Sequence, residues 1–181
     1  MEREGSMSEV AQIRNSAVAS SGTREVVARH MNMVYGLALT HTRCQGDADD
    51  VFQEVFLTYH RKQPECRDEE HRKAWLINTT LNCARRVAAD SWRTRVVPLA
   101  LDEVDALPGE FRFATEDQDA IFSALCVLPL DYRTVLYLFY FQDQPVTSIA
   151  QQLALEPGTV KMRLSRGRRM MREQLGELFS E

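Results

Sequence analysis

The sequence predicts an all-α fold made of two small helical domains. Apolar residues recur at helical spacing through most of the chain, few segments alternate as half-buried strands do, and runs of β-branched residues are short. No internal repeat is present. The chain has 181 residues, of which 44% are hydrophobic, and this composition is enough to bury the cores of one or two domains.

Three helices are expected in the N-terminal part, after a flexible tail over residues 1–22 that is rich in Ser and Ala. The first helix begins at Thr23, the second covers 47–62 and the third covers 69–93. Pro64 ends the second helix, because a residue before proline is pushed out of the helical region. The expected buried positions of the three helices are Val27, Met31, Val34 and Ala38; Ala48, Val51, Phe52, Val55 and Tyr59; and Leu76, Thr80, Cys83 and Val87.

A linker is expected over residues 98–115, and a second domain follows over 116–181. Residues 98–119 hold seven acidic residues and one arginine, a net charge of −6, together with two prolines and no sustained periodicity. Helices are predicted in the second domain over the ranges 116–127, 130–142, 146–153 and 157–178. Residues 157–172 carry six cations and no acid. The net charge of −4 therefore averages an acidic segment with a strongly basic one, and it does not exclude nucleic acid as a partner.

The two helices over 146–153 and 157–178 have the spacing of a helix-turn-helix. Ile149 and Ala150 give the first helix an inward face, while Val160 and Leu164 do so for the second. Pro157 suits a first helical position, where its missing N–H costs nothing. The alternative is an ordinary helical hairpin with a basic surface.

Polar and cationic side chains are expected on the outer face of the second of these helices. Arginine can donate two hydrogen bonds to guanine in the major groove, and neighbouring cations can bind phosphates. The candidate duplex-binding residues are Thr159, Lys161, Met162, Arg163, Ser165, Arg166 and Arg169.

Two more candidate surfaces lie in the N-terminal domain. The outer face of the helix over 47–62 is a candidate protein-binding surface, formed by Asp50, Gln53, Glu54 and Leu57. The alternative is that a single exposed leucine has no function. The helix over 69–93 combines aromatic, amide and guanidinium groups that suit single-stranded nucleic acid. These residues are Trp75, Asn78, Asn82, Arg85 and Arg86. The same spacing also fits Trp75 in the core with surface asparagines.

Both domains carry motifs that resemble bacterial RNA polymerase sigma factors. Asp47-Ala-Asp-Asp-Val-Phe-Gln-Glu-Val-Phe resembles the signature of region 2.2, and Ala74-Trp-Leu-Ile-Asn-Thr-Thr-Leu-Asn looks like the region that follows it. The segment from Leu128-Pro129 through Arg172 resembles region 4. Because only regions 2 and 4 are present with a short linker, the chain is similar to the extracytoplasmic-function (ECF) group.

The resemblance implies a function and partners. Region 2 would occupy residues 23–97, with Asp50, Gln53 and Glu54 docking on the β′ clamp helices of core RNA polymerase. The loop around 63–71 and the helix bearing Trp75 would capture the melted −10 element, while the helix over 157–172 would contact the −35 element as duplex. The β subunit and promoter DNA are the other expected partners, and many members of the family also bind an anti-sigma factor.

This chain departs from the usual family pattern at several positions. Ser148 and Ala154 stand where Glu and Gly are usual, and Glu156 and Met162 replace short polar residues. Promoter preference therefore cannot be transferred from other members.

No catalytic motif, metal-ligand set or cofactor-binding loop is recognised, so we expect no enzymatic activity, no metal and no cofactor. Four cysteines without a C-x-x-C pair and the absence of a membrane-spanning apolar run favour a cytoplasmic protein. The alternative functions are a free-standing helix-turn-helix repressor or activator and, less well supported, a nucleic-acid enzyme.

Overall fold

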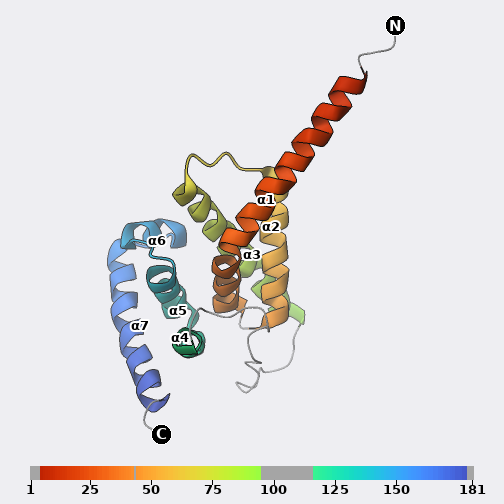
Figure 1. The fold of residues 1–181 in the computed structure, drawn as a ribbon. Coiled ribbons are helices and arrows are strands. Elements are labelled where there is room, and N and C mark those ends of the chain that lie inside the picture. Colours follow the sequence, from red (N-terminus) through yellow and green to blue (C-terminus); the bar gives the residue numbers. More distant parts are fainter. Residues whose placement is uncertain (1–4, 43, 95–115, 179–181) are drawn as a thin grey trace.

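The all-α prediction is confirmed. The computed structural model describes residues 5–42, 44–94 and 116–178, and every regular element within those ranges is a helix (Figure 1). The elements are α1 (Gly5–Thr42), α2 (Gln45–Lys62), α3 (Glu69–Thr94), α4 (Glu116–Val127), α5 (Leu130–Leu136), the π-helix η1 (Tyr137–Phe141), α6 (Val146–Leu153) and α7 (Pro157–Leu178). The expected acidic linker over 98–115 lies outside the described residues.

The first three helices pack against one another and form the N-terminal domain. Val34 and Ala38 of α1, Val51 and Val55 of α2, and Leu76 of α3 are completely buried in its core. These are positions that the helical periodicity predicts to be buried. Met31 is an exception, because it is 40% exposed and the buried stripe of α1 includes Met33 and Leu37 instead.

Helix α1 begins at Gly5, well before Thr23, and its N-terminal half extends away from the rest of the molecule (Figure 1). Residues 1–22 are predicted to form a flexible tail, but residues 5–22 belong to this helix. No proline interrupts the segment, and Ala, Glu, Gln and Arg favour helix even where no apolar stripe reveals one.

The ends of α2 are set by local hydrogen bonds. The sulfur atom of Cys44 accepts a hydrogen bond from the backbone N–H of Asp47 at 3.4 Å. At the other end Gln63 adopts the left-handed conformation with φ 41°, and its N–H donates to the carbonyl oxygen of Tyr59 at 2.8 Å. Pro64 follows directly, and the helix ends where its position predicts.

The C-terminal domain is built from α4, α5, η1, α6 and α7. Phe122 of α4, Val135 of α5, Leu138 of η1 and Ile149 of α6 are buried in its core. Gly167 of α7 lies against Leu136, and a Cβ there would approach the Cδ1 atom of Leu136 to 2.8 Å. Glycine at this position therefore lets α7 cross α5 closely.

The two domains pack directly against each other. Tyr137 of η1 is fully buried, and its hydroxyl donates a hydrogen bond to the carbonyl oxygen of Met33 in α1 at 3.1 Å. Lys73 of α3 donates to the carbonyl oxygen of Gln142 at 2.6 Å. Buried apolar residues of both domains belong to one continuous cluster. A hydrophobic core therefore spans the domain boundary.

Candidate nucleic-acid interface

The helix-turn-helix is formed by α6 and α7. Ala154 takes the left-handed conformation with φ 52° in the turn, and the N–H of Leu155 donates to the carbonyl oxygen of Ala150 at 2.8 Å. Ile149, Val160 and Leu164 are buried between the helices, as predicted. Pro157 is the first residue of α7. Because the inward face is fixed by these contacts, the opposite face of α7 is presented to solvent.

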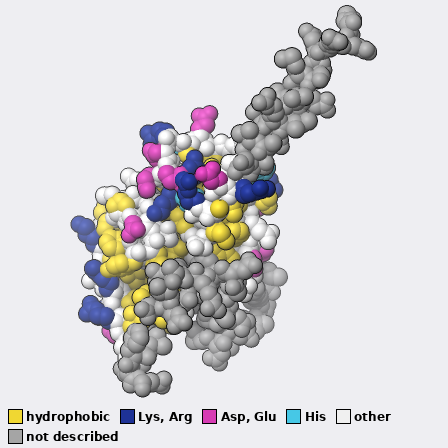
Figure 2. Space-filling view, viewed as in Figure 1, with side chains coloured by type: hydrophobic (Ala, Val, Ile, Leu, Met, Phe, Trp, Pro, Cys, Tyr) yellow, Lys and Arg dark blue, Asp and Glu magenta, His cyan; other side chains and the backbone are white. Residues whose placement is uncertain are grey.

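Most of the predicted duplex-binding residues lie on that exposed face. Thr159 is half-buried, and the exposed members are Lys161, Met162, Ser165, Arg166 and Arg169. Figure 2 shows Lys and Arg side chains along the edge of the molecule that α7 occupies in Figure 1. This edge therefore combines positive charge with hydroxyl and thioether groups.

Arg163 does not join the exposed set. Its guanidinium lies 3.0 Å from a carboxylate oxygen of Asp131 in α5, and its side chain is only 20% exposed. An arginine with this ion pair fixes α7 against α5. Arg169, by contrast, pairs with Glu173 of its own helix at 3.9 Å, with both side chains well exposed, and such an ion pair has little energetic value.

The predicted single-strand surface lies along α3. Asn78, Asn82, Arg85 and Arg86 are exposed, and Arg85 donates to the side-chain oxygen of Asn82 at 3.2 Å. Trp75 is half-buried and meets the ring of Tyr59 edge to face, with centroids 5.6 Å apart. Trp75 is therefore partly a core residue, as the alternative reading of its spacing requires.

The predicted protein-binding residues form one patch on α2. Asp50, Gln53 and Leu57 are exposed, with Leu57 at 47%, and Glu54 is half-buried. Arg86 of α3 lies 3.6 Å from a carboxylate oxygen of Glu54. This ion pair makes the patch on α2 continuous with the candidate single-strand surface on α3.

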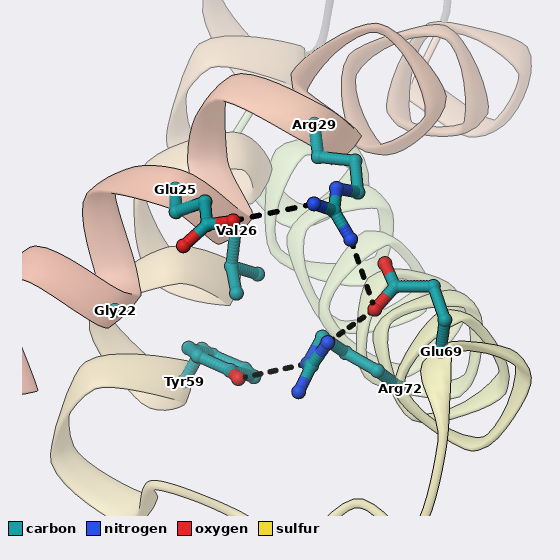
Figure 3. A pocket seen from close by; sticks show the side chains of 7 residues that line it. All are labelled: Gly22, Glu25, Val26, Arg29, Tyr59, Glu69 and Arg72. Atoms are coloured by element: carbon teal, nitrogen blue, oxygen red, sulfur yellow. Dashed lines mark hydrogen bonds and ion pairs between the residues drawn. The ribbon is translucent and has the colours of Figure 1, made fainter.

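A polar cleft between α1, α2 and α3 was not expected from the sequence (Figure 3). It has a volume of about 320 Å³ and is lined by Arg29, Tyr59, Glu69 and Arg72, among other residues. Glu69 is hydrogen-bonded to Arg72, and Arg72 donates to the hydroxyl of Tyr59 at 3.2 Å. Each of the three helices supplies a part of the cluster, so no local sequence motif could have predicted it.

His30 closes this cluster from the α1 side. Its Nε2 atom lies 2.6 Å from a carboxylate oxygen of Glu69. Burial lowers the pKa of His30 by more than the hydrogen bond to Glu69 raises it. For Glu69, burial acts to raise the pKa, but the hydrogen bond from His30 and the charges of Arg72 and Arg29 outweigh it, so the pKa is lowered. The neutral imidazole therefore donates a hydrogen bond from its Nε2–H group to the ionised carboxylate.

An apolar groove of about 280 Å³ lies on the C-terminal domain and was also missed. Ile121 and Leu125 of α4, Tyr140 of η1 and Met171 of α7 line it, and Arg168 lies at its edge. In the described part of the chain, no cluster of three or more His, Cys, Asp or Glu side chains could hold a metal ion. No described helix is long and apolar enough to cross a membrane.

Comparison with protein families gives two matches in chain order. The Sigma-70 region 2 model matches residues 26–95, and the Sigma-70, region 4 model matches residues 118–171. The chain is 30% identical over 156 residues to the ECF RNA polymerase sigma factor SigM of Mycobacterium tuberculosis, covering 85% of this chain and 77% of that protein.

More distant relatives have the same description. The chain is 28% identical over 162 residues to the probable RNA polymerase sigma factor RfaY of Xanthomonas campestris, but it spans only 40% of that protein. Among solved structures, the sigma factor RpoE of Bartonella quintana, in complex with the anti-sigma factor NepR, matches with a TM-score of 0.65 and 21% identity. That match covers 84% of this chain and 96% of the other, and it shows a shared fold.

Proposed function

Because this chain belongs to the ECF group of RNA polymerase sigma factors, which direct promoter-specific transcription initiation, we propose that α7 binds the −35 element as duplex DNA and that α3 helps to melt the −10 element. The observation that carries the proposal is the exposed face of α7. It is the outer face of the second helix of a helix-turn-helix, and it presents cations opposite a buried apolar stripe.

The outer face of α7 has the chemistry that duplex recognition needs. Arg166 and Arg169 are exposed and can donate to guanine or to phosphate, and Lys161 can bind phosphate as a point charge. Arg163 has a different role in this proposal. Its ion pair with Asp131 holds the recognition helix at a fixed angle to α5, so it positions the helix instead of touching DNA.

The exposed amides and guanidinium groups of α3 support the proposal for the −10 element. Asn78 and Asn82 can donate to and accept from the edges of unpaired bases, while Arg85 and Arg86 can bind the strand backbone. The ring of Trp75 is half-buried and is held in place by its edge-to-face contact with Tyr59, and an unpaired base can stack on such a ring. Unstacking a base step costs a few kcal/mol, so such a surface must hold the extruded base and its strand.

The patch of Asp50, Gln53, Glu54 and Leu57 is proposed to dock on the β′ clamp helices of core polymerase, and the apolar groove beside α4 is proposed for the β subunit. The similarity to a sigma factor solved with an anti-sigma factor supports such a protein as a further partner. Sigma factors are non-catalytic initiation factors. We propose that this one acts in the cytoplasm, without catalytic activity of its own.

The packing between the domains constrains how a promoter can be bound. The −35 and −10 elements are centred about 25 base pairs apart, which is about 85 Å of duplex. A compact body of about 150 residues has a radius of gyration of only about 15 Å. Contacts such as the hydrogen bond from Lys73 to the carbonyl oxygen of Gln142, at 2.6 Å, hold the two domains together. While they are held in this way, the proposed surfaces of α3 and α7 cannot reach both promoter elements at once. The two domains must therefore separate when the promoter is bound.

The duplex-binding proposal is tested with a matched pair of arginine variants. Arg166 and Arg168 are both exposed on α7. At about 100° per residue, their side chains point about 160° apart around the helix axis. Arg166→Ala should weaken binding of a −35 duplex and lower the slope of log K against log salt by about 0.9. Arg168→Ala, with the same change in charge, should alter both quantities less. Equal effects of the two variants would contradict the proposed face.

A further inference from the structure

Met162 occupies the centre of the exposed face of α7. It is 39% exposed, whereas Met170 and Met171 of the same helix are partly buried against the hydrophobic core. At about 100° per residue, Met162 lies opposite Leu164 and within about 40° of Arg166. Packing within this chain therefore does not explain an apolar side chain at this position.

The surroundings of Met162 are polar. Its neighbours on the outer face are Thr159, Ser165, Arg166 and Arg169, so it does not belong to a larger apolar patch on the helix. A single thioether is thus placed among hydrogen-bond donors and cations, in the N-terminal half of the helix. In a helix-turn-helix this half approaches base edges.

The major groove offers one apolar group that such a side chain can contact. Each base pair presents donors and acceptors there, and only thymine adds a methyl group, at C5. Methionine is unbranched and polarizable, so it can adjust its torsions to cover a methyl group without a rigid fit. Serine and arginine beside it can satisfy the polar edges of neighbouring bases.

We propose that Met162 is a specificity-determining residue that contacts the 5-methyl group of a thymine in the −35 duplex. The inference rests on the proposed function of α7 and adds the base that this position selects. It predicts a stronger preference for thymine than serine at the same position would confer, because the short side chain of serine has no apolar group that reaches the methyl group.

The test replaces thymine by uracil, which removes only the methyl group. The full chain with core RNA polymerase is used to select duplexes from a pool randomised over the −35 element. Each selected thymine is then changed to uracil, and affinity is measured for the wild type, Met162→Ala and Met162→Leu. One replacement should weaken the wild type about fourfold, the effect of one buried methyl group. The same replacement should leave Met162→Ala unchanged, and Met162→Leu should regain the dependence.

Two results would overturn the inference. The wild type could tolerate every replacement of thymine by uracil, or Met162→Ala could lose as much affinity as the wild type at the same position. A pool from which no −35 sequence is enriched would instead overturn the proposed duplex reading, and this inference with it. Circular dichroism controls for folding, which substitution of an exposed residue should preserve.

Discussion

Tyr137 of the C-terminal domain packs directly on Gly36 of the N-terminal domain. A Cβ atom at position 36 would overlap the phenol oxygen and lie 3.0 Å from the Cζ atom of the ring. The hydroxyl donates to the carbonyl oxygen of Met33 and accepts from the amide of Gln142 at 3.1 Å. Burial is the main reason that the pKa of Tyr137 is raised, so the hydroxyl stays protonated and can donate. The contact thus joins the domain that carries the proposed −10 surface to the domain that carries the proposed −35 surface.

Gly36→Ala should destabilise this packing, because the new methyl group needs space that Tyr137 fills. Overpacking of this kind costs about 1–3 kcal/mol, and chemical denaturation would show it as a lower midpoint. Gly46→Ala is the control, since a Cβ at Gly46 meets nothing within 4 Å. Adding Tyr137→Phe removes the overlapping oxygen and should restore part of the loss. If Gly36→Ala is as stable as wild type, the domains do not pack in this way in solution.

Promoter binding should separate the two domains. Fluorophores can be placed at Arg24 of α1 and Gln151 of α6, which are both exposed and outside the proposed binding surfaces. Their separation should increase by tens of ångströms when core polymerase and promoter DNA are added. An unchanged energy-transfer efficiency in the complete complex would contradict the need for separation.

Acid should weaken the folded state through His41. Its Nε2 atom lies 3.2 Å from the hydroxyl oxygen of Thr134, and burial, with the charges of Arg133 and Arg85, lowers its pKa to about 4. The unfolded chain binds this proton near pH 6.5. The contribution of neutral His41 to stability is therefore complete above pH 6.5 and is lost as the pH falls towards 4.

The size of this acid effect is on the order of 3 kcal/mol, since each unit of pKa difference is worth about 1.4 kcal/mol. Unfolding by urea at several pH values measures it. His41→Gln keeps a polar group near Thr134 but does not titrate, so its stability should fall less between pH 6.5 and 4. A variant that loses as much stability as wild type over that interval would exclude His41 as the source.

Ala154→Gly should stabilise the helix-turn-helix. Ala154 has φ 52°, a left-handed conformation that costs a residue with a Cβ about 1–2 kcal/mol. Glycine removes that cost but loses about 0.5–1 kcal/mol through its greater freedom in the unfolded chain. A net gain of up to about 1.5 kcal/mol is expected in thermal or urea unfolding. A loss of stability would mean that the turn has a different conformation.

Local sequence signals predicted the second domain well. The predicted ranges 146–153 and 157–178 coincide with α6 and α7, because a proline at the first helical position and a buried apolar stripe mark them. The start of α1 was missed, since the segment before Thr23 has helix-forming residues but no apolar stripe to mark it.

Contacts between distant segments could not be predicted. A helical projection places Arg163 near the outer face of α7, but only the tertiary structure brings Asp131 within 3.0 Å of it. The same holds for Glu69, whose partners His30 and Arg29 come from α1, and for the pairing of Tyr137 with Gly36. Single-sequence periodicity gives the direction of a side chain along its own helix, and it contains no information about which helix lies opposite.

Run-off transcription tests the central claim most directly. Purified core RNA polymerase is supplied with promoter-containing DNA fragments, with and without the full chain. The Leu57→Asp variant, which changes the proposed polymerase-binding patch, is assayed in parallel. Discrete transcripts should form only when the wild-type chain is present, and the chain should co-purify with core polymerase. If the chain neither redirects core polymerase to a start site nor co-purifies with it, the account is wrong.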